Sequence, residues 1–292
     1  MSTVILLLFT GVGLGALYFL VASGLSLIYG LMHVLNFAHG VFLTLGAYLG
    51  WMMAMQIGTH TWSGFLLSLL VGAVVGGVFA ALTELFLIRP LYERHIEQVL
   101  VTVGLALASV ALYEGIWGSD PINISGPAWL GQVTSIFGAR VPNKVFVMII
   151  AGVLVLLAMV IFLQKTRYGM IIRAGVENRQ MVTALGIDVR KSFTVVFTIG
   201  GAAAGIGGVL ASQYFTYISP HLGQTLLIFA FIVTVIGGLG SLAGAAVAAV
   251  LVAVLQQFAN YYIPGTPGDF VVVLLLAVVL LLRPTGLMGK KA

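Results

Sequence analysis

The sequence predicts an all-α fold, a polytopic integral membrane helix bundle of about eight or nine transmembrane segments. Of its 292 residues, 61% are hydrophobic and only 7% are charged, whereas soluble domains carry about 25% charged residues. Apolar stretches recur along the whole chain, so a single signal peptide or anchor does not explain the composition. We expect residues 1–292 to form one transmembrane domain, with some of its helices broken or re-entrant.

The candidate spans follow from the lengths of the apolar stretches, because a helix needs about 20 apolar residues to cross a hydrocarbon core of roughly 30 Å. The first stretch lacks the basic flank and the cleavage site of a signal peptide, and we expect it to be retained. In chain order the candidate spans are 4–30, 36–56, 63–88, 98–117, 144–164, 193–217, 225–258 and 268–284.

Basic residues predict the orientation, since short cytoplasmic loops of membrane proteins are enriched in Lys and Arg. The first 88 residues contain neither, and counting spans back from Arg89 places the N-terminus outside. In the arrangement described next, only Arg140 and Lys144 lie outside. A cytoplasmic C-terminus and cytoplasmic loops 89–97 and 165–191 put eleven of the thirteen basic residues inside: Arg89, Arg94, Lys165, Arg167, Arg173, Arg179, Arg190, Lys191, Arg283, Lys290 and Lys291.

The stretch 225–258 is too long for one crossing. As a straight helix its 34 residues would extend about 51 Å at 1.5 Å per residue. Lys191 and Arg283 are both expected inside, so an even number of crossings separates them. The run Gly237-Gly-Leu-Gly-Ser241 interrupts the stretch, and we predict two short helices that meet there in a full or a re-entrant hairpin.

A second interruption, around 33–40, separates the first two spans. His33, Asn36 and His39 cost free energy in hydrocarbon unless they are hydrogen-bonded or face a cavity. Either they line a translocation pathway beside a discontinuous helix, or they hold neighbouring helices together. Paired Gly-interrupted segments in the two halves of a chain can mark a transport pathway, although close helix packing also explains the glycines. The candidate pathway residues are Asn36, His39, Gly40, Gly237, Gly238, Gly240 and Ser241.

The longest polar segment, 165–192, is expected in the cytoplasm. Within it, 176–185 predicts a short helix, and Gly186 suits the left-handed position after a helix end, with Ile187 as the apolar contact. The surface of this helix mixes polar residues with Met181, Ala184 and Leu185. The helix either lies on anionic lipid or docks a cytoplasmic partner.

No catalytic constellation is visible. The chain has no cysteine, no G-x-x-x-x-G-K-[ST] phosphate loop and no H-E-x-x-H zinc motif, so we predict no catalytic residue and no metal ligand. Glu84 falls near the end of a span, and Glu114 and Asp269 fall near the outside face. The absence of an acidic pair at membrane centre argues against a transporter driven by an ion gradient.

Four groups of motifs cover most of the chain. They are Gly24-Leu-Ser-Leu-Ile-Tyr-Gly30 with Leu35-Asn-Phe-Ala-His-Gly40 and Leu45-Gly-Ala-Tyr48; Arg167-Tyr-Gly169 with Ala184-Leu-Gly-Ile187 and the glycines of 200–208; Phe231-Ile-Val-Thr-Val-Ile-Gly-Gly-Leu-Gly-Ser-Leu-Ala-Gly244; and Leu282-Arg-Pro-Thr-Gly-Leu287. In this order they resemble the LivH family, the membrane permease subunits of ABC importers for branched-chain amino acids and related compounds.

The resemblance implies a multi-subunit importer in the bacterial cytoplasmic (inner) membrane that works by alternating access. Its partners would be a second related permease subunit (LivM-like), two cytoplasmic ATPase subunits (LivG- and LivF-like) and an extracytoplasmic solute-binding protein. The chain would bind no cofactor and no nucleic acid, and ATP and magnesium would be held by the ATPases. In this family the cytoplasmic loop docks in a cleft of an ATPase, which assigns that role to Glu177, Met181, Ala184, Leu185 and Gly186.

The cargo is less constrained. Many members of the family carry Glu directly after the Asn-Phe-Ala-His-Gly motif, where this chain has Val41. Branched-chain amino acids are the expected cargo, and urea, short amides and aromatic acids are the alternatives. Two rival classes are a stand-alone secondary transporter or channel, which would need ion sites within the membrane, and a membrane-embedded enzyme, which would need clustered His, Asp and Glu.

Overall fold

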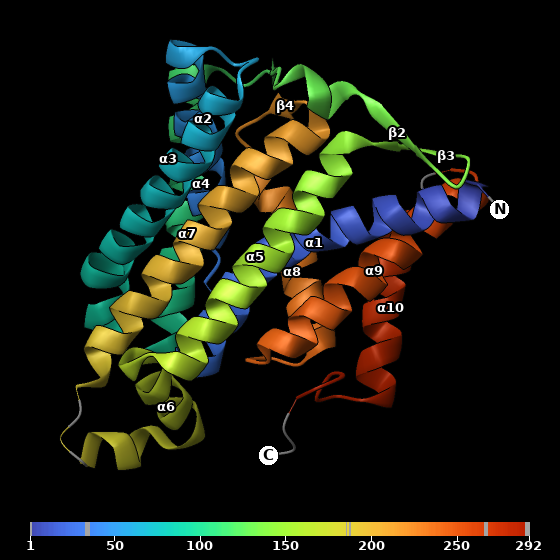
Figure 1. Ribbon diagram of the computed structural model, residues 1–292. Coiled ribbons are helices and arrows are strands. Elements are labelled where there is room, and N and C mark those ends of the chain that lie inside the picture. Colours follow the sequence, from blue (N-terminus) through green and yellow to red (C-terminus); the bar gives the residue numbers. More distant parts are fainter. Residues whose placement is uncertain (1, 33–35, 185, 187, 266–267, 290–292) are drawn as a thin grey trace.

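The protein is a helix bundle with four short strands at one end (Figure 1). The computed structural model describes residues 2–32, 36–184, 186, 188–265 and 268–289, without the side chains of 176–180 and 183. The helices are α1 (Ser2–Met32), α2 (His39–Ile57), α3 (Trp62–Thr83), α4 (His95–Trp117), α5 (Asn143–Lys165), α6 (Arg167–Ala184), α7 (Val189–Phe215), α8 (Leu222–Gly237), α9 (Leu242–Tyr262) and α10 (Gly268–Leu282). Shorter turns are the π-helix Glu84–Ile88 and the 3-10 helices Arg89–Leu91 and Ala128–Gly131.

The helices confirm the predicted fold class. Within the described residues, seven helices are long and apolar enough to cross a membrane, and α8 and α10 are apolar but shorter. The eight predicted spans correspond to these nine helices, because 225–258 divides into α8 and α9. The remaining helix, α6, has an exposed polar face and does not belong to this set.

The two ends of the bundle differ (Figure 1). One end, called the strand end, carries β1 (Ile122–Asn123), β2 (Val133–Ile136), β3 (Ala139–Pro142) and β4 (Tyr217–Ile218), with β1 antiparallel to β4 and β2 antiparallel to β3. The other end, called the α6 end, carries α6. The N-terminus lies at the strand end and the C-terminus at the α6 end. The sequence did not predict the strands, because ladders this short show no alternation of apolar and polar residues.

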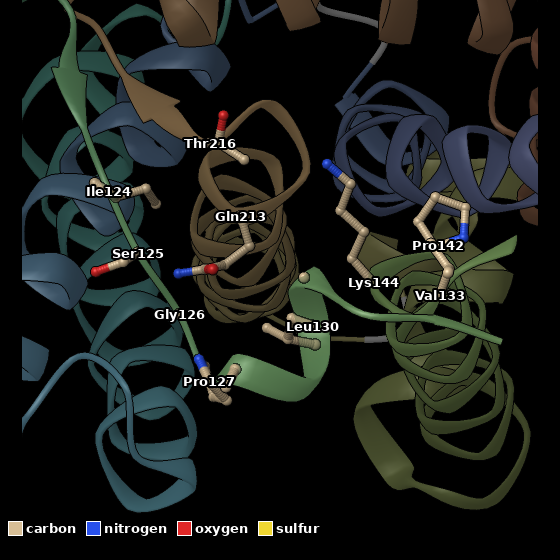
Figure 2. Close-up of a pocket in the computed structure, with 12 residues that line it drawn as sticks. Ile124, Ser125, Gly126, Pro127, Leu130, Val133, Pro142, Lys144, Gln213 and Thr216 are labelled. Carbon is tan, nitrogen blue, oxygen red and sulfur yellow. The ribbon is translucent and has the colours of Figure 1, made fainter.

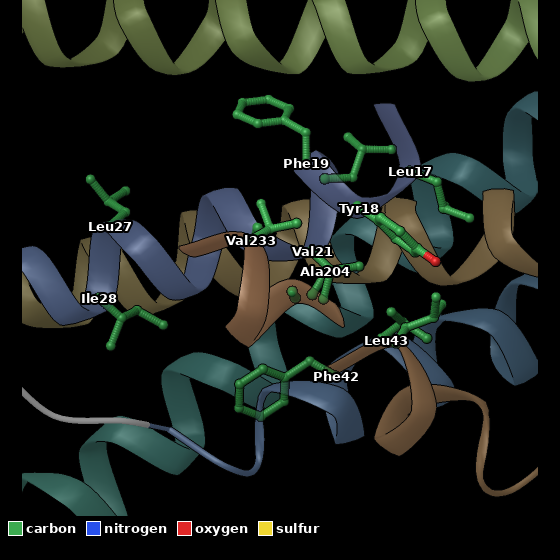
Figure 3. Close-up of a cluster of buried hydrophobic side chains, with 14 of the residues drawn as sticks. Leu17, Tyr18, Phe19, Val21, Leu27, Ile28, Phe42, Leu43, Ala204 and Val233 are labelled. Carbon is green, nitrogen blue, oxygen red and sulfur yellow. The ribbon is translucent and has the colours of Figure 1, made fainter. Parts of the chain in front are cut away.

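The core is built around α1 and α7, which are buried along most of their length. Side chains of α1, α2, α7 and α8 meet there, among them Leu17, Phe42 and Val233 (Figure 3). Glycines bring α7 and α3 into backbone contact, since a Cβ atom on Gly72 would lie 2.9 Å from the carbonyl oxygen of Gly205. Such close approach of small residues is the usual way in which helices associate in lipid.

Local sequence explains where several helices begin. In α3, α7 and α9, a side-chain oxygen of the residue before the helix accepts a hydrogen bond from a backbone N–H of the first turn. Thr61 caps α3 through Gly64 N, Asp188 caps α7 through Arg190 N, and Ser241 caps α9 through Gly244 N.

The predicted hairpin is confirmed. The helices α8 and α9 meet at 238–241, where Gly238 and Gly240 have φ angles of 103° and 82°. These angles lie in the region that favours glycine. In Figure 1, α8 leads from β4 to the turn at 238–241, and α9 returns from this turn toward the strand end.

The predicted start of the docking helix was wrong. The helix α6 begins at Arg167 rather than at 176. Thr166 explains the early start: its hydroxyl accepts from Gly169 N at 3.0 Å and donates to the carbonyl oxygen of Phe162 at 2.7 Å, so it joins α6 directly to α5. The predicted left-handed position of Gly186 is confirmed by its φ of 77°. Leu185 and Ile187 lie outside the described residues.

Candidate functional site

The first interruption lies inside the bundle, against the middle of α1. Asn36 and His39 are 1% and 0% exposed, and His33 lies outside the described residues. The Nε2 atom of His39 lies 3.1 Å from the carbonyl oxygen of Val21. The side-chain oxygen of Asn36 accepts from Ala38 N at 3.0 Å, and its backbone oxygen accepts from His39 N at 3.2 Å. Asn36 therefore stabilises the turn that starts α2, and His39 joins α2 to α1.

One nitrogen atom of each of these side chains is buried without a partner. Asn36 Nδ2 and His39 Nδ1 make no hydrogen bond to the described residues. An unsatisfied buried polar atom costs about 1–3 kcal/mol, and such atoms in native proteins call for an explanation. Both side chains make packing contacts in this conformation, and their place in a pathway stays a prediction.

Gly40 lies where α2 meets the start of α8. A Cβ atom on Gly40 would come within 2.7 Å of the carbonyl carbon of Gly223. The hydroxyl of Thr44 accepts from Gly223 N at 2.9 Å and donates to the carbonyl oxygen of Gly40 at 3.2 Å. Thr44 thus caps α8, whose own N-cap residue His221 makes no capping side-chain bond. The sequence did not predict this contact, because a single Thr in an apolar helix carries no local signal.

The second interruption lies nearer the α6 end. A Cβ atom on Gly30, close to the end of α1, would lie 3.0 Å from the Cα atom of Gly240. Two backbone N–H groups of the C-terminal segment satisfy the last carbonyls of α8: Leu287 N donates to Ile236 O at 2.8 Å and Met288 N to Gly237 O at 3.0 Å. The C-terminal motif therefore packs on the glycine motif, and Ser241 caps α9 beside it.

The two interruptions contact different parts of α1. The first lies beside Val21 and the second beside Gly30, which are about 13 Å apart along a helix that rises 1.5 Å per residue. The structure therefore groups Asn36, His39 and Gly40 in one cluster. It groups Gly237, Gly238, Gly240 and Ser241 in another.

The helix α6 presents two distinct faces. Gly169, Ile172, Gly175 and Val182 are buried, and their spacings of three and seven residues place them on one helix face. Of the predicted docking residues, Met181 is 64% exposed and Ala184 and Gly186 are exposed. The side chain of Glu177, like Leu185, lies outside the described residues. Tyr168 and Met170 are exposed on the same helix.

The strand end contains a cavity of about 500 Å³, which no sequence motif predicted (Figure 2). The chain reversal after α7 and the start of α5 form two of its sides. Lys144 donates to the carbonyl oxygen of Tyr214 at 2.7 Å, as expected of a cation at a helix C-terminus. The lining residues are Ile124, Ser125, Gly126, Pro127, Ala128, Leu130, Gly131, Val133, Pro142, Lys144, Gln213 and Thr216.

The described residues contain no group of three His, Cys, Asp or Glu side chains that could hold a metal ion. The nine apolar helices, the buried interruptions and the amphipathic helix at one end define a multi-pass helical membrane protein.

Comparisons with known proteins place the chain within that class. The family model described as branched-chain amino acid transport system / permease component matches residues 7–282. The chain therefore belongs to the family of branched-chain amino acid transport system permease components. It is a permease component of ABC-type transporters, a transport subunit rather than an enzyme.

Three relatives illustrate the range of the family. The high-affinity branched-chain amino acid transport system permease protein LivH of Salmonella typhimurium is 30% identical, over 97% of this chain and 94% of its own length. The corresponding protein BraD of Pseudomonas aeruginosa is 28% identical, over 97% and 95%. The fructose import permease protein FruF of Bifidobacterium longum is also 28% identical, over 91% and 74%.

Proposed function

We propose that this chain is the membrane-spanning permease of an ATP-driven importer for branched-chain amino acids or related small solutes. The observation that carries the proposal is the similarity to LivH over nearly the whole of both chains. A relative named as a fructose permease matches a large part of the chain, so the choice of cargo rests on the matches to LivH and BraD, which cover more of both chains.

The α6 end faces the cytoplasm in this proposal, and the membrane is the bacterial inner membrane. Lys165, Arg167, Arg173, Arg190 and Lys191 are exposed around α6, and this enrichment in basic residues is typical of cytoplasmic loops. The C-terminus is then cytoplasmic and the strand end faces a solute-binding protein.

The exposed face of α6 docks an ATPase subunit, while its buried face transmits the motion. Exposed Tyr168, Met170 and Met181 are of the residue types that are enriched in protein interfaces. On the buried side, a Cβ atom on Gly175 would lie 3.0 Å from the side chain of Leu31 in α1. A displacement of α6 would therefore move the end of α1, which Gly175 faces, and the start of α7, which follows α6 in the chain. Two ATPase subunits and a second, related permease complete the importer.

The test is purification and reconstitution of the importer with its ATPases and binding protein. Changing Met181 and Ala184 together to Glu should remove most of the ATPase that co-purifies and abolish ATP-driven leucine uptake. Phe137→Glu, which alters a side chain 89% exposed at the strand end, is the matched control and should retain the ATPase. Equal ATPase recovery from both variants would contradict docking through α6.

The same liposomes test the cargo and the class of transporter. Leucine uptake that needs ATP and the binding protein supports the proposal, whereas uptake of fructose, urea, a short amide or an aromatic acid in place of leucine would reassign the cargo. Leucine uptake by this chain alone, without ATP, would instead make it a stand-alone transporter or channel.

A further inference from the structure

A buried carboxylate lies where α3 ends, and nothing in the proposed docking or pathway uses it. The side chain of Glu84 is 0% exposed and begins the π-helical turn Glu84–Ile88. Its carboxylate accepts a hydrogen bond from Thr194 Oγ1 at 2.7 Å, another from the hydroxyl of Tyr92, and a longer one from Arg89 Nε at 3.4 Å. Burying a charge is costly unless it is paired and hydrogen-bonded, and three residues donate hydrogen bonds to this carboxylate.

The partners of Glu84 also contact the start of α7. Arg89 Nη2 donates to Thr194 Oγ1 at 2.8 Å, and the ring of Tyr92 packs edge-on against Phe193, with centroids 5.0 Å apart. Burial, and then the hydrogen bond to Glu84, raise the pKa of Tyr92 above its ordinary value. Its hydroxyl therefore stays protonated at neutral pH and donates. Side chains of the segment 84–92 thus contact two adjacent residues of α7, Phe193 and Thr194.

The start of α7 is also connected to α6 through the chain. The chain passes from Ala184, the last residue of α6, to Val189, the first of α7. A Cβ atom on Gly175 of α6 would lie 3.0 Å from the side chain of Leu31 and 3.9 Å from that of Val189. A displacement of α6 therefore reaches Thr194 after little more than one turn of α7. From Thr194 it reaches the end of α3 through Glu84.

The end of α3 has an irregular turn at the residue that such a displacement would reach. Single-turn π-helices inside longer helices are rare and occur frequently at functional sites. The turn Glu84–Ile88 begins at the residue that Thr194 contacts. Beyond it, glycines hold α3 directly on α7, so the polar cluster continues the contact between the two helices to the end of α3 and the start of α7.

We propose that Glu84 and Thr194 are positioning residues that link movement of α6 to α3, and thereby couple ATP hydrolysis to solute movement. The inference rests on the proposed function, because it requires ATPases docked on α6. It assigns no contact with solute to either residue. Loss of the link leaves ATP hydrolysis running while solute movement falls.

The test measures ATP hydrolysed per solute imported by the reconstituted importer. Thr194→Val keeps the side-chain shape and removes the hydroxyl, and Glu84→Gln keeps the size and removes the charge. Both should raise the ratio by about fivefold or more, the factor that corresponds to the loss of one hydrogen bond. Thr194→Ser retains the hydroxyl and should keep the normal ratio. Thr198→Val is the control, since among the described residues the Thr198 hydroxyl bonds only to Thr194 O, within α7.

The outcomes separate this inference from the proposed function. If the unaltered importer shows no ATP-driven uptake, the proposed function fails. If it couples normally and Thr194→Val has the same ratio as Thr198→Val, only the present inference fails. Loss of assembly in Thr194→Val, with normal assembly of Thr198→Val, would also overturn the inference, because the cluster would then be a folding contact alone.

Discussion

Removal of one hydroxyl, in Thr44→Val, tests whether the α2–α8 contact stabilises the fold. The variant keeps the shape of the side chain but leaves Gly223 N, now 2.9 Å from Thr44 Oγ1, without its acceptor. That N–H belongs to the first turn of α8, where helices have no internal acceptor, and Thr44 is only 1% exposed. An orphaned buried donor costs about 1–3 kcal/mol, which corresponds to about a 5- to 150-fold shift in the folding equilibrium.

The loss of stability is smaller if the same backbone N–H finds other hydrogen-bond partners in the micelle when the chain is unfolded. For that reason, hydrogen bonds between membrane helices contribute only about 0.6 kcal/mol on average in double-mutant cycles. We therefore expect Thr44→Val to lose about 1–2 kcal/mol, since it also leaves a donor unpaired. Unfolding by SDS in mixed micelles, followed by circular dichroism, gives the free energy.

Two matched variants make the measurement decisive. Thr44→Ser keeps the hydroxyl and should recover most of the loss. Thr225→Val removes an exposed hydroxyl of α8 that, among the described residues, bonds only to His221 O at 3.3 Å. This variant should stay within about 0.5 kcal/mol of the parent. If Thr44→Val and Thr225→Val unfold at the same SDS fraction, the capping argument is refuted.

Two further predictions concern the first interruption. Gly40→Ala places a methyl group against the backbone of Gly223 and should cost about 1–3 kcal/mol in the same titration; Gly104→Ala, which meets nothing within 4 Å, should cost nothing, and equal losses would show that the two helices are not in tight contact. Changing Asn36 and His39 together to Ala should lower uptake by the assembled importer about tenfold, equivalent to about 1.4 kcal/mol. Normal uptake by that double variant would leave neither residue a role in the pathway.

Several features of the fold could be predicted because they depend on local composition. The apolar lengths predicted the membrane helices, and Gly237-Gly-Leu-Gly-Ser241 predicted the turn between α8 and α9. The early start of α6 was missed, although Thr166 carried a local signal as a capping residue. The strands β1–β4 were missed because they are too short to show a pattern.

The sequence by itself determined the class of this protein, its helices and the positions of its two interruptions. These follow from the cost of exposing polar backbone to lipid and from the turn geometry of glycine, which act within a few residues. Only the tertiary structure decided that His39 meets Val21, that Thr44 caps α8 and that Glu84 meets Thr194. Thr44 and Gly223 are 179 positions apart, and a hydrogen bond over such a separation leaves no pattern in the residues beside either partner.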